Sequence, residues 1–234
     1  MRNTSSKLFF SILYPLLFVA ILWLVKLFEL AFDFKFFWYG IFPRTLNGLT
    51  GIAFAPLIHS NLDHLISNSI PLFLLGTIMF YFYRSIAFKV FFWIYIMTNV
   101  WVWVAARSSY HIGASGVLYG FVCFLFFSGI FRKDTKLMAI SLFVTFLYGS
   151  MTWGIFPIFN GVSWESHLLG SIAGIITAYN FRKEGPQAKK YDWGTDEENE
   201  LIDVSGEQEN SDNNDSNTLN IQYTFIQKDE KAKD

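Results

Sequence analysis

The sequence predicts an all-α membrane protein, with six transmembrane helices, a membrane-embedded first loop and a C-terminal tail. Three observations support this class: the overall composition, the series of long apolar runs and an abrupt change to acidic sequence. Of the 234 residues, 53% are apolar, 20% aromatic and 16% charged. A typical soluble domain has fewer aromatic and more charged residues. The apolar residues are grouped in runs that approach the roughly 20 residues needed to cross a bilayer.

Six such runs are expected to form the membrane helices, at about 8–28, 62–83, 90–106, 115–131, 137–153 and 165–182. The first run follows a short basic lead, as a signal peptide would. It is too long for the apolar part of a signal peptide, however, and no small-residue cleavage site follows it. We therefore interpret it as the first membrane helix.

Residues 29–60 separate the first two helices and have a different character. Phe and Trp are dense here, but scattered charges, glycines and prolines interrupt any spanning helix. Aromatic side chains mixed with charges suit the interface between lipid and water. The segment is therefore predicted to be a lateral loop half sunk in one leaflet, and an ordinary extramembrane loop is the weaker alternative.

The distribution of basic residues predicts the orientation. Eleven lie in segments on the side of the two termini, and only three or four lie on the opposite side. Basic residues favour the cytoplasmic side of a membrane protein. Both termini are therefore expected to be cytoplasmic, in a multi-pass protein of the cell membrane.

The composition changes at residue 184, which we take as the end of a membrane domain of residues 1–183. Of the 19 acidic residues, 14 lie from Glu184 onward. Segment 184–234 cannot bury a core and is predicted to be a disordered cytoplasmic tail. The basic residues flank membrane helices and do not form a nucleic-acid-binding patch. The single cysteine, Cys123, excludes a disulfide within the chain.

Polar side chains inside membrane helices are costly, so each is a functional candidate. In the predicted topology three helices start at the outer surface, and their first turns carry such residues: His59, His64 and Asn68 near the second helix, Ser115 in the fourth and His167 in the sixth. His64 and Asn68 are four residues apart and share a helix face. Both can donate hydrogen bonds to an oxyanion, although they could also only join helices.

Glycines at a four-residue spacing occur in the fourth and sixth helices, as Gly116 with Gly120 and as Gly170 with Gly174. This spacing often indicates nothing more than close helix packing. Here close packing would bring the histidine of the sixth helix within reach of the serine of the fourth.

A serine beside a histidine is an activated nucleophile. Glu165 is two residues from His167 and so lies off its helix face, which favours a Ser115–His167 dyad without a carboxylate. Tyr119, one turn below Ser115, could stack on the imidazole or be only a core aromatic residue.

These motifs, in this order and on this side of the membrane, resemble those of the rhomboid family of intramembrane serine proteases. The resemblance covers about residues 8–182, and the matching pieces are His59-x4-His64-x3-Asn68, Gly113-x-Ser115-Gly116-x2-Tyr119-Gly120 and His167-x2-Gly170-x3-Gly174.

The resemblance implies a six-helix rhomboid-like bundle with Ser115 and His167 as the catalytic dyad. It assigns the oxyanion to His64, Asn68 and the serine's own N–H group. The other matching residues are supporting ones: His59, Gly113, Gly116, Tyr119, Gly170 and Gly174. No cofactor or metal is expected. The implied partners are the lipid bilayer and single-span transmembrane substrates, cleaved near the outer end of the helix.

Three further features lie outside the matching motifs. The family's first loop often bears a Trp-Arg pair, but Trp38 and Arg44 are separated here, so neither is given a function. His111 matches no motif and is expected to be an interfacial side chain. Residues 154–164 contain glycine and proline and are predicted to form a movable gate.

Two alternatives to a protease remain at the level of sequence. A non-enzymatic relative that binds membrane helices would be expected to lack Ser115 or His167, and both are present. A small transporter would need polar residues through the full depth of the membrane, whereas the candidates here gather in one leaflet.

Overall fold

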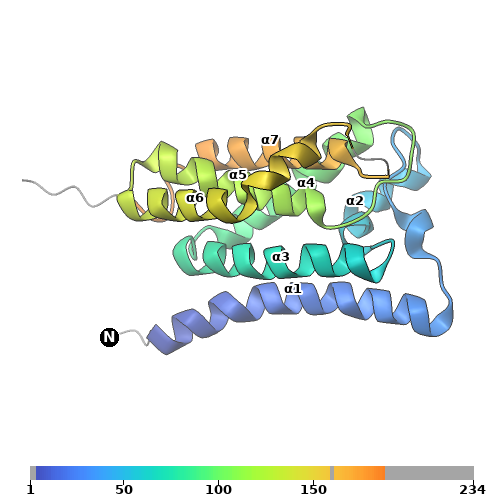
Figure 1. The fold of residues 1–234 in the computed structure, drawn as a ribbon, viewed down its shortest axis with the longest axis horizontal. Helices are drawn as coiled ribbons and strands as arrows, with labels where there is room; N and C mark the ends of the chain where they lie inside the picture. The colour runs from blue at the N-terminus through green and yellow to red at the C-terminus, as the bar shows by residue number, and fades with distance from the viewer. Residues whose placement is uncertain (1–3, 159–160, 188–234) are drawn as a thin grey trace, which may run out of the picture. The chain divides into compact units, whose positions relative to one another are not determined.

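The computed structural model describes residues 4–158 and 161–187, and these are all-helical (Figure 1). They contain seven α-helices and no β-strand, which confirms the predicted all-α class. The helices are α1 (Thr4–Phe32), α2 (Gly51–Phe54), α3 (Leu62–Phe82), α4 (Ala87–Ala105), α5 (Ser115–Arg132), α6 (Thr135–Tyr148) and α7 (Trp164–Asn180).

Four of these helices, α1, α3, α4 and α5, are long and apolar enough to cross a membrane. Together with the family assignment given below, they make the chain a multi-pass membrane protein. The helices α6 and α7 have 14 and 17 residues, which is short for the roughly 20 residues of a straight crossing. The count of six spans therefore stays a prediction.

Two predicted helices differ from the structure by more than a few residues. The first, predicted at 8–28, is four residues longer at each end as α1. The predicted helix 137–153 corresponds to α6, which ends five residues earlier than predicted. It begins earlier because the Asp134 carboxylate accepts hydrogen bonds from the backbone N–H groups of Lys136 and Leu137, which caps α6. The α-helix ends at Tyr148 and continues as the 3-10 helix η4 (Gly149–Ile155). A tighter helix of this kind is common at the end of an α-helix.

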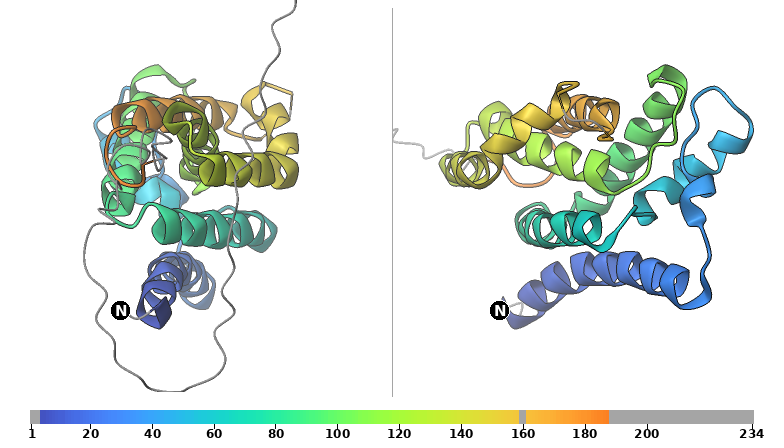
Figure 2. Two further views of the ribbon diagram at one scale, coloured as in Figure 1. Left: turned by 90° about the vertical axis from the view of Figure 1, so that its left-hand side faces the viewer. Right: turned by 45° about the vertical axis from the view of Figure 1, so that its right-hand side comes forward.

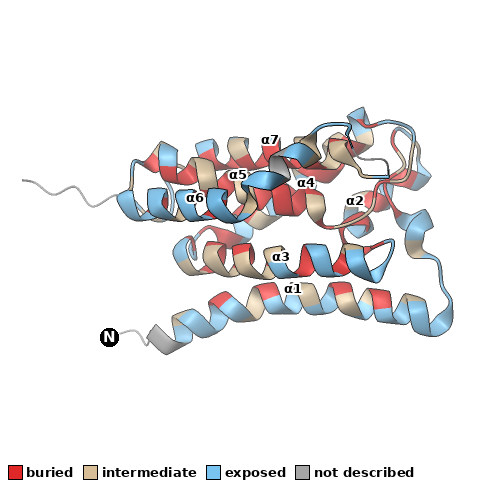
Figure 3. Ribbon diagram, viewed as in Figure 1, coloured by how far each residue is buried: buried red, intermediate tan, exposed pale blue. Residues whose placement is uncertain are grey.

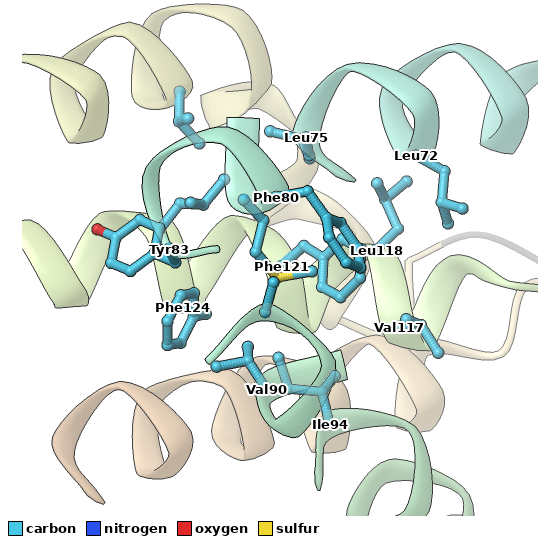
Figure 4. Close-up of a cluster of buried hydrophobic side chains, with 14 of the residues drawn as sticks. Leu72, Leu75, Phe80, Tyr83, Val90, Ile94, Val117, Leu118, Phe121 and Phe124 are labelled. Atoms are coloured by element: carbon cyan, nitrogen blue, oxygen red, sulfur yellow. The ribbon is translucent and has the colours of Figure 1, made fainter. Parts of the chain in front are cut away.

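Helix α5 occupies the centre of the helical packing. It packs against α3, α4, α6 and α7, and its residues 116–121 are all buried. Figure 4 shows Phe121 and Phe124 of α5 in a buried cluster with Leu75 of α3 and Ile94 of α4. A helix that is apolar on most sides is typically surrounded by other helices, as α5 is here.

Helix α1 lies at the edge of the bundle and packs chiefly on α3 (Figures 1 and 2). Its residues turned toward α3 are buried, whereas most of the others are exposed (Figure 3). The exposed ones include many leucines and phenylalanines. An exposed apolar surface of this kind is typical of a helix that contacts membrane lipid.

The first loop, residues 33–61, folds into short helical turns rather than extended chain. It contains α2 and the 3-10 helices η1 (Phe36–Tyr39), η2 (Asn47–Leu49) and η3 (Ala55–Leu57). Its Arg44 guanidinium donates hydrogen bonds to the carbonyls of Val104 and Ala106 at the end of α4, at 3.2 and 2.8 Å. Arg44 thus ties the loop to α4, a contact that the sequence did not reveal. Immersion of the loop in a leaflet stays a prediction.

The predicted tail lies largely outside the described residues, which end at residue 187. Its predicted disorder and the boundary at residue 183 are therefore not tested. At the described end, Arg132 of α5 donates hydrogen bonds to the carbonyls of Phe181, Arg182 and Glu184, which follow α7.

Candidate active site

A cavity of about 700 Å³ lies at the end of the helices where α3, α5 and α7 all begin. It is lined by polar side chains from these three first turns, together with parts of the loops that precede them. Each helix N-terminus contributes backbone N–H groups without intrahelical partners and a partial positive charge. The sequence-predicted residues that line the cavity are His64, Asn68, Ser115, Tyr119 and His167.

Ser115 and His167 are in direct contact. The Ser115 Oγ atom lies 2.8 Å from the His167 Nε2 atom. Tight glycine packing between α5 and α7 permits this distance. A Cβ atom added to Gly170 would lie 2.0 Å from the Gly116 carbonyl oxygen, and one added to Gly174 would lie 2.2 Å from the Gly120 oxygen. No side chain fits at either position, so the four-residue glycine spacing brings the two helices together.

The second ring nitrogen of His167 faces the carbonyl oxygen of Gly154 in η4, at 2.9 Å. A carbonyl oxygen can only accept, so the Nδ1 atom carries the proton and a neutral ring leaves Nε2 as an acceptor. That tautomer accepts the hydrogen of the Ser115 hydroxyl. Residue types and spacing do not indicate that the Gly154 carbonyl orients the ring, because this carbonyl is a backbone group.

Tyr119 stacks on the imidazole of His167, with ring centroids 4.2 Å apart and planes 6° from parallel. The phenol also reaches η4, where a Cβ atom added to Gly154 would meet the Tyr119 oxygen. The ring of His167 is thus fixed by a hydrogen bond at each nitrogen and by an aromatic face. The histidine is 8% exposed.

The His64 side chain lies on the α3 side of the cavity. Its Nδ1 atom is 3.2 Å from the Ser60 hydroxyl, and its backbone N–H donates to the Asn61 carboxamide oxygen, which caps α3. The ring crosses directly over Gly113, where a Cβ atom would be 2.7 Å from His64 Cε1. Gly113 also has a φ of +104°, a conformation that favours glycine.

Asn68 is 3% exposed, and its Nδ2 atom donates to the His64 carbonyl oxygen at 2.7 Å. A carboxamide has two N–H groups, so one remains after this bond. The Ser115 N–H group belongs to the first turn of α5, which has no side-chain cap. The cavity thus brings together an imidazole, a carboxamide and a helix N-terminus as donors.

His59 lies behind these groups and is only 2% exposed. Its Nε2 atom accepts a hydrogen bond from the Ala114 N–H group at 3.4 Å. Its ring meets that of His64 edge to face, with centroids 5.0 Å apart. Burial lowers the pKa of His59 to about 4, so the ring is neutral near pH 7 and can accept this bond.

His111 departs from its expected role as an interfacial side chain, because it is buried and 2% exposed. Its Nδ1 atom lies 2.6 Å from the Ser163 hydroxyl just before α7. Burial lowers its pKa. Arg107 and Glu165 form an ion pair nearby, with Nε and Oε1 3.4 Å apart. Among the described residues no cluster of His, Cys, Asp and Glu could hold a metal ion.

The sequence of this chain is similar to a known protein family and to several known proteins. The model of the Rhomboid domain matches residues 47–184. Uncharacterized proteins of Mycobacterium tuberculosis and Mycobacterium bovis are each 38% identical over 177 residues, which is 70% of this chain and 72% of the relative. An uncharacterized protein of Mycobacterium leprae is 35% identical over 174 residues, 70% of this chain and 68% of the relative. No solved structure matches the chain. The chain belongs to the rhomboid family.

Proposed function

We propose that this protein is an intramembrane serine endopeptidase that cleaves a peptide bond in or near the outer end of a substrate's transmembrane helix. Members of the rhomboid family are in general intramembrane serine proteases, although some are inactive. The observation that carries the proposal for this chain is the 2.8 Å contact between Ser115 Oγ and His167 Nε2. This chain has both a nucleophile and a base, whereas an inactive relative would be expected to lack one of them.

In the proposed mechanism, Ser115 Oγ attacks the carbonyl carbon of the scissile bond while His167 Nε2 takes the hydroxyl proton. Collapse of the tetrahedral intermediate breaks the C–N bond, and His167 gives its proton to the leaving amine. A water molecule then attacks the acyl-enzyme in the same way and releases Ser115. The Gly154 carbonyl holds Nδ1–H throughout, which keeps Nε2 directed at the reacting atoms.

The negative charge on the intermediate's oxygen needs donors aimed at it. We assign this role to the His64 side chain, the Asn68 carboxamide and the Ser115 N–H group, which border the same cavity. Losing one such donor typically lowers the rate about 10²–10³-fold. Hydrogen bonds of this kind are often poorly aligned before substrate binds, which suits the Asn68 bond to the His64 carbonyl.

Hydrolysis requires water, which the hydrocarbon core of a membrane does not supply. We place the cavity near the outer surface, both termini in the cytoplasm and the protein in the cell membrane, on the basic-residue distribution. Substrates are then single-span membrane proteins whose helix unwinds near its outer end. Residues 154–164 are the proposed gate, of which residues 159 and 160 lie outside the described residues. The Gly154 carbonyl links the start of this gate to His167.

A fluorophosphonate probe, which reacts with activated serines, tests the nucleophile without knowledge of the substrate. We expect the wild type to be labelled and Ser115→Ala and His167→Ala to insert normally but resist labelling. The same three proteins, expressed with a panel of tagged single-span proteins, should give fragments only for the wild type. Identical fragments from wild type and Ser115→Ala would remove the protease function and leave a helix-binding relative.

A further inference from the structure

We infer that His111 is a positioning residue that sets the approach of His167 to Ser115, acting through a hydrogen bond to Ser163. The inference rests on the proposed function of the site. His111 lies four residues before Ser115, and Ser163 lies four residues before His167. The His111–Ser163 contact, at 2.6 Å, is therefore a second connection between the same two segments, four residues before each member of the dyad.

The backbone of His111 is held in place independently of its ring. It pairs with Ile41 of the first loop, donating from N–H to the Ile41 carbonyl at 2.9 Å and accepting from the Ile41 N–H at 3.0 Å. This bridge is isolated from any sheet. The first loop thus provides a fixed support from which the imidazole can reach α7.

The contacts of the ring define its tautomer. Nε2 lies 3.1 Å from the Arg107 carbonyl oxygen, which can only accept, so Nε2 carries the proton. Nδ1 of the neutral ring therefore accepts the hydrogen of the Ser163 hydroxyl. The Ser163 oxygen in turn lies 2.6 Å from the Ser166 hydroxyl, which donates to it. The hydrogen bonds thus form a series in which Ser166 donates to Ser163, Ser163 to His111, and His111 to the Arg107 carbonyl.

Ser163 occupies the position just before α7, where a serine hydroxyl usually accepts from backbone N–H groups of the first turn. Its side chain makes no such bond here. The hydroxyl is instead directed to His111 and Ser166. The start of α7 is therefore fastened to the segment that carries Ser115, and Ser166 is the immediate neighbour of His167.

The two ring nitrogens allow the positioning role to be separated from a local structural one. In His111→Asn the carboxamide oxygen can take the place of Nδ1 and keep the bond to Ser163. In His111→Gln the carboxamide N–H can take the place of Nε2 and keep only the bond to Arg107. If the α7 connection matters, asparagine rescues the site and glutamine does not. A purely local role would give the opposite order.

The measurement is the inactivation of the full-length protein by the fluorophosphonate probe, resolved into binding and reaction steps. We expect His111→Phe and His111→Gln to lower the reaction step about 10²-fold, since a displacement of about 1 Å costs roughly that factor. Probe binding should change little. His111→Asn should remain within about threefold of wild type. Ser109→Ala is the matched control, because that hydroxyl touches the same ring at 3.4 Å but does not reach α7.

Ser163→Ala should reproduce the loss, and combining it with His111→Phe should add nothing further, since both remove one connection. In spectra of ¹⁵N-histidine-labelled protein, the His167 Nε2 resonance should move in the glutamine variant and not in the asparagine variant. This signal does not depend on activity, so it separates failure of the inference from failure of the proposed function. Wild-type behaviour of Ser163→Ala, additive losses, or better rescue by glutamine would overturn the role of His111.

Discussion

Replacing Gly170 by alanine should push α7 away from α5 and lower the reactivity of Ser115 about 100-fold. The new Cβ atom would lie 2.0 Å from the Gly116 carbonyl oxygen, whereas ordinary contact begins at 3.4 Å. The helices must therefore separate by about 1.4 Å, the difference between these distances, because a backbone atom cannot turn aside. The Ser115–His167 distance of 2.8 Å would then exceed hydrogen-bonding range, and misplacement by about 1 Å can cost about 10²-fold in rate.

The assay is the rate of fluorophosphonate labelling, measured beside the thermal unfolding temperature in the same detergent. Gly149→Ala is the control, because among the described residues a Cβ atom there meets only Thr145 Cγ2, at 3.8 Å. Overpacking at Gly170 costs about 1–3 kcal/mol, and removing a helical glycine regains about 0.5–1 kcal/mol. The protein should therefore stay folded. Labelling of Gly170→Ala at the wild-type rate would refute the claim that glycine packing sets the dyad distance.

Three further outcomes follow from the contacts around the site. Tyr119→Ala should label several-fold more slowly than Tyr119→Phe, because phenylalanine keeps the ring face that supports the imidazole at 4.2 Å; equal rates in these two variants would exclude the stacking role. Lys26→Met should lower stability by about 3–5 kcal/mol, since it leaves Glu29 and the His59 carbonyl without their buried partner; adding Glu29→Gln should recover part of the loss, measured as unfolding temperature. His59 has a pKa lowered to about 4, so stability should be full above about pH 6.5 and fall as the pH drops toward 4; a similar acid loss in His59→Gln would show that another group is responsible.

The positions of site residues were most predictable from the sequence where those residues lie on regular helices. The apolar runs predict α3, α5 and α7 within a few residues of their observed ends. Glycine spacing then predicted the close approach of α5 and α7, because a helix without side chains on one face can contact another backbone. The contact of Ser115 with His167 followed from these two facts and from the common side on which both helices begin.

The loops were not predictable in the same way, because their contacts depend on backbone atoms and on partners far away in the chain. Arg44 caps the end of α4, and the Gly154 carbonyl orients His167. Neither contact has a signature in residue type or spacing. The role of His111 is hidden for a related reason: an imidazole just before a membrane helix is expected to be interfacial, and only the fold shows its contact with Ser163.

Within the described part of the chain, the Nδ1 atom of His167 faces a carbonyl and not a carboxylate, which has a physical rationale under the proposed mechanism. A buried charge in a membrane protein is costly, and the nearest carboxylate, Glu165, is directed to Arg107 instead. The Gly154 carbonyl fixes the same tautomer that a carboxylate would fix, without introducing a charge. The imidazolium that forms during the reaction then lacks a counter-ion, but the Tyr119 ring lies parallel to it at 4.2 Å. An aromatic face attracts a cation and does so more strongly when both are removed from water, so Tyr119 supplies without charge part of what a third catalytic residue would provide.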